Sequence, residues 1–188
     1  MWWSEMRLGV SRLVRLAAPL VAAGLLAGCF QPLYGEHSIG GGPSIKAAFG
    51  SVDVSQIPAP SGSPESRIAV DVRNSLLFAL NADSKPIAPA YRLNIRMSST
   101  RLSVIVDLRS ARPDLENFGL NVTYSLVEAK TGKVVINDVT FARVSYDIPG
   151  QEQRFARARG LRDAENRAGQ VIAEHIKNRL ASYFVAGT

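Results

Sequence analysis

Residues 91–97 read YRLNIRM, and apolar and polar side chains alternate along the whole segment. In an extended chain the four odd-numbered residues fall on one side and the three even-numbered residues on the other. Alternation of this kind predicts a β-strand with one face in a core and one face toward solvent. The predicted solvent face carries two arginines, Arg92 and Arg96.

The strand pattern continues to residue 147 with two interruptions. After residues 98–100 the apolar residues shift by one position, to Leu102, Val104 and Val106, which predicts a β-bulge or a bend. Residues 118–126 alternate again, and residues 129–133 (AKTGK) predict a compact hairpin turn in which Gly132 takes a positive φ. The last strand is expected over residues 134–147, with a second shift near residues 137–138.

Two helices and one further strand are expected around these strands. Residues 47–57 read as a first strand. Ser63 as N-cap and Pro64 at the first helical position predict a helix that runs to about Leu80, with an apolar stripe at every fourth residue from Ile68. A second, longer helix is expected over about residues 153–184, with a basic start and two glycines, Gly160 and Gly169, as weak points.

The predicted order is therefore β-α-β-β-β-α. A single sheet with both helices on one face buries both apolar stripes and needs only short connections. The predicted fold class is α+β: a two-layer sandwich of one mostly antiparallel four-stranded sheet with two helices on one face. The other face of the sheet is left to solvent or to a partner.

The first 28 residues read as a targeting segment. Three arginines precede an apolar run over residues 16–26, which is too short to span a bilayer, and LAGC (residues 26–29) ends the segment. This order resembles a bacterial lipoprotein signal with its lipobox. We therefore expect cleavage before Cys29, which then carries diacylglycerol and an N-acyl chain, with no other cofactor. The alternative is an ordinary thiol behind an uncleaved anchor.

The expected layout has three parts: a signal peptide over residues 1–28, a lipidated tether over residues 29–46 and one domain over residues 47–188. The residue after Cys29 is Phe30 and not an aspartate, which favours delivery to the outer membrane. Two or more acyl chains on the cysteine would hold the protein stably on that membrane. Residues 29–188 contain 14 arginines and five lysines. Arginine pairs with phosphate and carboxylate in bidentate fashion, so acidic lipid, glycolipid or protein is the expected partner, and nucleic acid is not.

The sequence shows no catalytic or metal-binding constellation. It has two histidines far apart, one cysteine, and no G-x-S-x-G, H-E-x-x-H or P-loop motif. We therefore expect a binding or assembly protein and no enzyme, with no metal site.

Two stretches carry a resemblance to a known family. Residues 29–35 (CFQPLYG) resemble the C-G-F-x-P-L-Y-G opening of the lipopolysaccharide-assembly lipoproteins, the LptE family, although the glycine after the cysteine is missing. Residues 144–148 (VSYDI) and 163–168 (DAENRA) resemble a segment of its alphaproteobacterial members. The predicted element order also fits that family's two-layer sandwich.

The resemblance implies a task. Such a lipoprotein plugs and helps to assemble the LptD β-barrel translocon of the outer membrane, faces the periplasm and the barrel lumen, and helps to insert lipopolysaccharide into the outer leaflet. The alternative is an accessory periplasmic lipoprotein that scaffolds a different envelope complex without binding glycolipid. The candidate lipopolysaccharide contacts lie on the polar strand face and in the following strand end and loop: Arg92, Arg96, Arg101, Arg109 and Arg112.

Overall fold

The computed structural model describes residues 44–81, 88–107, 112–148 and 154–186. Cys29, the signal peptide and most of the tether lie outside the described residues. In chain order the elements are α2 (Ile45–Gly50), β1 (Val52–Val54), α3 (Pro64–Asn81), β2 (Tyr91–Asp107), β3 (Arg112–Glu128), β4 (Val134–Asp147) and α4 (Arg154–Ala186).

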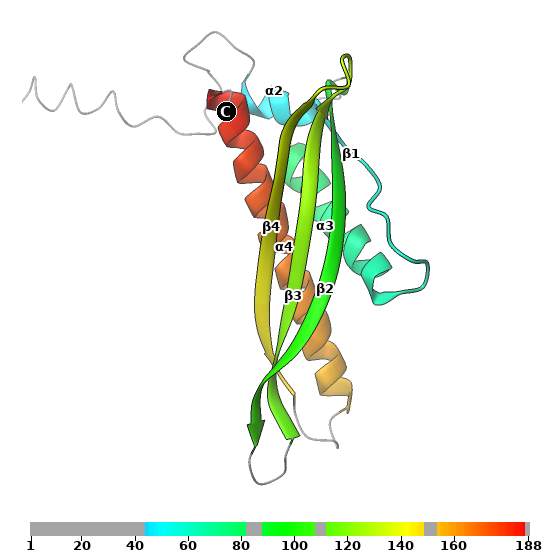
Figure 1. Ribbon diagram of the computed structural model, residues 1–188, viewed down its shortest axis with the longest axis vertical. Coiled ribbons are helices and arrows are strands. Elements are labelled where there is room, and N and C mark those ends of the chain that lie inside the picture. Colours follow the sequence, from blue (N-terminus) through cyan, green and yellow to red (C-terminus); the bar gives the residue numbers. More distant parts are fainter. Residues whose placement is uncertain (1–43, 82–87, 108–111, 149–153, 187–188) are drawn as a thin grey trace, which may run out of the picture. The chain divides into compact units, whose positions relative to one another are not determined.

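The four strands form one mixed sheet in the order β1-β2-β3-β4. The short β1 runs parallel to β2, and the β2–β3 and β3–β4 pairs are antiparallel. Helices α3 and α4 pack against the same face of the sheet (Figure 1). This confirms the predicted α+β sandwich of a mostly antiparallel four-stranded sheet with its helices on one side.

The first element differs from the prediction of a strand over residues 47–57. Residues 45–50 form the short helix α2, and only three residues, Val52–Val54, join the sheet. The Ser44 hydroxyl caps the helix, because it accepts a hydrogen bond of 3.2 Å from the Ala47 amide. Phe49 is buried all the same, from a helix rather than from a strand.

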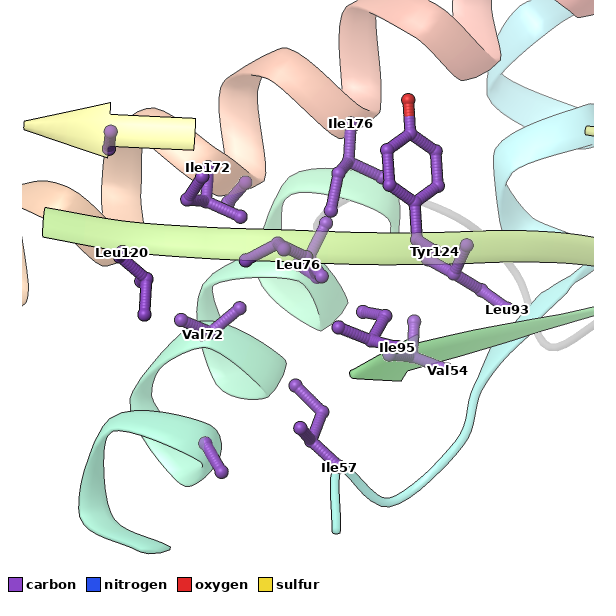
Figure 2. Close-up of a cluster of buried hydrophobic side chains, with 14 of the residues drawn as sticks. Val54, Ile57, Val72, Leu76, Leu93, Ile95, Leu120, Tyr124, Ile172 and Ile176 are labelled. Carbon is purple, nitrogen blue, oxygen red and sulfur yellow. The ribbon is translucent and has the colours of Figure 1, made fainter. Parts of the chain in front are cut away.

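The core lies between the sheet and the two long helices. The predicted stripe of α3 is fully buried, and Leu76 lies between the strands and Ile172 and Ile176 of α4 (Figure 2). Leu93 and Ile95 of β2 and the even-numbered residues of β3 from Phe118 to Leu126 form the opposite wall. The alternation in residues 91–97 therefore marks the core side correctly.

Strand β2 does not shift its phase after residues 98–100, which contradicts the prediction. Its pairing with β3 continues unbroken from Tyr91 to Ser103, and the register shifts fall only at residues 103–106. Leu102 consequently stays on the face away from the helices, where 69% of it is exposed. Arg101 and Ser103, on the helix side, are exposed too. A phase shift at this point would interrupt the pairing of β2 with β3. It would not bury Leu102, because the neighbouring positions on the helix side are themselves exposed.

The β3–β4 hairpin follows the prediction more closely. Gly132 in the turn has a φ of 71°, a conformation that glycine adopts without strain. The bulge in β4 lies at Val135, since Leu126 pairs with Ile136 and Val127 pairs with Val134. It therefore precedes the predicted position at residues 137–138.

Helix α4 spans the predicted residues, and its two glycines have different surroundings. A Cβ at Gly169 would lie 3.3 Å from Cγ2 of the buried Val72, whereas a Cβ at Gly160 would meet only ordinary contacts at 3.5 Å. Gly169 therefore allows the close approach of α3 and α4. None of the helices in the described ranges is long and apolar enough to cross a membrane.

Replacing Gly160 with alanine is expected to raise the free energy of unfolding by about 0.5–1 kcal/mol, because alanine favours the helix and fits the space. Replacing Gly169 with alanine should raise it less or lower it, because Val72 has to move. Urea denaturation of both variants measures the difference. An equal gain at both positions would contradict the close packing of Gly169 against Val72.

Candidate binding face of the sheet

The side of the sheet turned away from α3 and α4, called the open face below, is not covered by any described element. Parity along the strands places side chains of three kinds on it: polar, basic and exposed apolar. The residues are Arg92, Asn94, Arg96, Ser98, Thr100 and Leu102 of β2, Asn117, Asn121, Thr123 and Ser125 of β3, and Asn137, Val139, Phe141, Arg143 and Ser145 of β4.

A hollow of about 420 Å³ lies on the open face. Its walls come from strands β2, β3 and β4 and from residues 55–58, which follow β1. Residues 55–58 are held to β2 at their start, because the Ser55 amide donates to the Leu93 carbonyl at 3.0 Å and the Ser55 hydroxyl donates to Asn94 Oδ1 at 3.0 Å. The hollow is therefore a feature of the tertiary structure and not of one strand.

The five candidate arginines do not form one group. Arg92 and Arg96 share the open face, as predicted. Arg92 lies 3.9 Å from Asp53 (Nε to Oδ2), and Arg96 lines the hollow. Arg101 pairs with Phe118 in the ladder and so lies on the helix side of the sheet, apart from Arg92 and Arg96. Arg109 lies outside the described residues.

For Arg112 only the backbone is described. It starts β3 opposite Asp107, at the far end of the β2–β3 ladder from Tyr91. The structure therefore brings together Arg92 and Arg96, separates them from Arg101, and does not describe the position of the Arg112 side chain.

Strand β4 adds a part of the open face that the sequence reading missed. Val139 and Phe141 are 65% and 56% exposed, and the Arg143 guanidinium lies 5.3 Å from the centre of the Phe141 ring. The signal was present in the sequence: the three residues are spaced by two, opposite in parity to the buried Ala142. The open face thus has a polar, basic part over β2 and β3 and an apolar row along β4.

A polar cluster on the helix side joins the sheet to the start of α4. The Tyr146 hydroxyl donates to the buried Glu116 carboxylate, and Arg157 Nη2 donates to Glu116 Oε1 at 3.1 Å. Burial is the largest cause that raises the pKa of Tyr146, to about 12, and the hydrogen bond to Glu116 is the second largest. Tyr146 is therefore neutral at physiological pH, and the cluster has the character of a structural contact.

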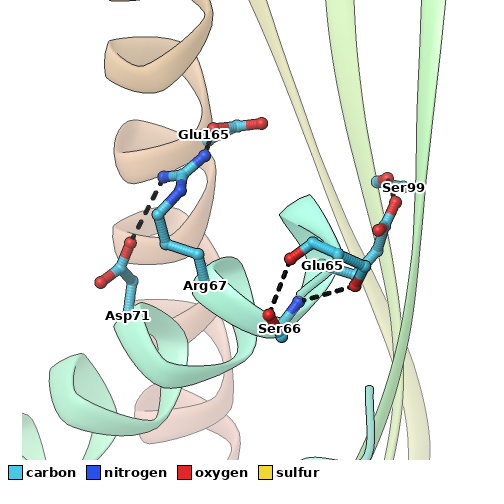
Figure 3. A network of polar contacts seen from close by, with 7 residues as sticks. Glu65, Ser66, Arg67, Asp71, Ser99 and Glu165 are labelled. Carbon is cyan, nitrogen blue, oxygen red and sulfur yellow. Dashed lines mark hydrogen bonds and ion pairs between the residues drawn. The ribbon is translucent and has the colours of Figure 1, made fainter. Parts of the chain in front are cut away.

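A second contact joins the start of α3 to β2. Ser66 N–H donates to Ser63 Oγ at 3.2 Å, which confirms Ser63 as the N-cap, and Ser99 Oγ donates to Glu65 Oε1 at 3.0 Å (Figure 3). The backbone amide of Glu65 and the Ser99 hydroxyl lower the pKa of the Glu65 carboxyl.

His175 of α4 and Thr140 of β4 share a hydrogen bond of 2.9 Å. Within the described ranges no group of three or more His, Cys, Asp or Glu could hold a metal ion.

Comparison with known proteins places this architecture among bacterial lipoproteins of known structure. No family model and no curated protein matches the chain. The crystal structure of "a putative lipoprotein" from Caulobacter crescentus CB15 superposes with a TM-score of 0.60 and 21% identity, over 77% of this chain and 97% of that one. A minor lipoprotein from Acinetobacter baumannii gives a TM-score of 0.51 and 15% identity, over 70% and 91% of the two chains.

At these identities the similarity shows the fold alone. The sandwich of one mixed sheet with its helices on one side is thus a fold also found in two bacterial proteins described as lipoproteins. The function of this chain has to be argued from its own residues.

Proposed function

We propose that this chain is an outer-membrane lipoprotein, anchored through Cys29, that plugs an LptD-type β-barrel, assists its assembly and helps to place lipopolysaccharide in the outer leaflet. The observation that carries the proposal is the open face. One whole face of the sheet stays uncovered by the described helices and presents hydroxyls, amides and arginines. The lumen of an outer-membrane barrel is polar, and such a face suits it.

Two sequence features point in the same direction. LAGC at residues 26–29 supplies the lipid anchor, and CFQPLYG and DAENRA resemble stretches of the LptE family. DAENRA falls on α4, where Ala164, Glu165 and Ala168 are buried. That segment therefore helps to seat α4 on the rest of the domain, and the open face remains available for a partner.

Depletion of the protein in its native cell tests the proposal. We expect lipopolysaccharide to disappear from the cell surface and the barrel partner to accumulate in a misassembled form. Re-expression of the wild-type chain should restore both, whereas a Cys29→Ala chain should restore neither fully, because it lacks the anchor. Normal surface display after depletion would rule the proposal out.

The second candidate is a lipoprotein that scaffolds a different envelope complex. The exposed apolar row of Val139 and Phe141 favours a protein partner of some kind, because exposed apolar side chains that lie together mark contact sites. The identity of the protein that co-purifies distinguishes the two candidates.

A further inference from the structure

The hollow on the open face has the lining of a site for a polar ligand. Its neutral polar side chains all carry a hydroxyl or an amide: Ser55, Gln56, Asn94, Thr123, Ser125 and Asn137. Hydroxyls and amides both donate and accept hydrogen bonds, as sugar hydroxyls require. The volume of about 420 Å³ lies within the range of roughly 300–1,000 Å³ that is usual for small-molecule sites.

The charge of the lining is positive only. Among the described residues that line the hollow, Arg96 is the only charged one and none carries a carboxylate. Arg96 is exposed and has no ion pair within the part of the chain that the structure describes, whereas the neighbouring Arg92 lies beside Asp53. A guanidinium with free donors binds a carboxylate or a phosphate with charge-assisted hydrogen bonds.

Part of the lining is fixed before any ligand enters. The Ser55 hydroxyl donates to Oδ1 of Asn94 at 3.0 Å, which fixes the Asn94 amide in the lining and uses its oxygen rather than its Nδ2 hydrogens. Asn94 pairs with Ser125 across the β2–β3 ladder, and Ser125 pairs with Asn137 across the β3–β4 ladder. Three polar side chains are thus held in one row by backbone pairing, and Arg96 with Thr123 forms the next row.

We propose that this hollow binds a sugar that carries one carboxylate or phosphate group, with Arg96 on the acidic group and the row Asn94, Ser125 and Asn137 on the ring hydroxyls. We assign this sugar to the acidic sugars of the glycolipid, and this choice of source rests on the proposed function. Murein also contains acidic sugars, and the experiment separates the two sources.

The test uses the full-length protein in detergent with D-glucuronate as the probe and amide chemical shifts as the readout. We expect saturable shifts centred on residues 94–96, 123–125 and 137. Arg96→Gln should weaken binding at least about tenfold, because a charge-assisted bond is lost. Arg159→Gln, an exposed arginine on α4 away from the hollow, is the matched control and should change the affinity less than about twofold. D-glucose should bind at least roughly tenfold more weakly than glucuronate.

Shifts centred elsewhere, equal binding of D-glucose, or an equal loss in Arg159→Gln and Arg96→Gln would overturn the assignment. Competition then identifies the source: displacement of glucuronate by core oligosaccharide released from lipopolysaccharide indicates the glycolipid, and displacement by soluble murein fragments indicates murein. Displacement by neither would also overturn it. Sugar binding is measured on the purified protein, whereas pairing with the barrel is measured in membranes. A negative result for the sugar site can therefore be distinguished from a negative result for the proposed function.

Discussion

Replacing Leu76 with alanine is expected to lower the free energy of unfolding by roughly 3–5 kcal/mol. Leu76 lies in α3 and is fully buried in the core between the sheet and α4 (Figure 2). Truncation removes three buried carbon atoms and leaves a cavity. Its walls belong to the sheet and to two long helices, so they cannot close on it without moving a whole element. Urea denaturation at constant pH measures the loss.

Phe78 provides the matched control on the same helix. It is apolar and larger than leucine, but it is 76% exposed. Phe78→Ala should therefore change the free energy of unfolding by no more than about 0.5 kcal/mol. If Phe78→Ala proved as costly as Leu76→Ala, the face of α3 that packs on the sheet would be assigned wrongly.

Replacing Arg67 with alanine is expected to cost about 2–3 kcal/mol. The Glu165 carboxylate on α4 is almost wholly buried, and Arg67 of α3 forms an ion pair with it (Figure 3). Removing one member of a buried pair leaves the other charge uncompensated, at about 3–5 kcal/mol when both are buried. The expected loss is smaller here because 39% of the Arg67 side chain is exposed. Chemical denaturation, with the slope compared to that of the wild type, measures it.

Two controls separate this buried pair from ordinary surface charge. Asp71→Asn removes the other, exposed partner of Arg67, at 3.8 Å, and should cost less than about 0.5 kcal/mol. Arg67→Met combined with Glu165→Leu removes both charges and should recover most of the loss. Arg67→Ala with no greater effect than Asp71→Asn would show that Glu165 does not depend on Arg67.

The fold was largely predictable because its main elements have strong local signals. Alternation in residues 91–97 identifies the core side of β2, and Ser63 with Pro64 marks the start of α3, where the Ser63 hydroxyl does cap the helix. The errors fall where local pattern and tertiary pairing compete. Leu102 looks like part of a shifted apolar face, yet unbroken pairing with β3 keeps it exposed.

The candidate site was predictable only in part. Parity alone puts Arg92 and Arg96 on one face, but it cannot bring Gln56 to Asn137, which are far apart in the sequence and line the same hollow. Because the shift predicted after residues 98–100 does not occur, Arg101 keeps the parity of the core side and lies apart from Arg92 and Arg96. Phe141 and Arg143 follow from the alternation of β4, once Ala142 is recognised as the buried position.

We propose that the open face occupies the lumen of an LptD-type barrel. Purification of the full-length protein from cell membranes under mild detergent, followed by identification and quantification of the co-purifying proteins, is the most direct test. A charged side chain at Phe141, as in Phe141→Glu, should weaken the complex, because the apolar row on β4 is then broken. Phe78→Glu, on the opposite layer, serves as the control.

We expect a barrel of translocon size to co-purify in a ratio of about 1:1, to be lost or reduced with Phe141→Glu and to be retained with Phe78→Glu. Co-purification of a transporter or a murein-associated protein in place of the barrel would contradict it, and would support the scaffolding alternative.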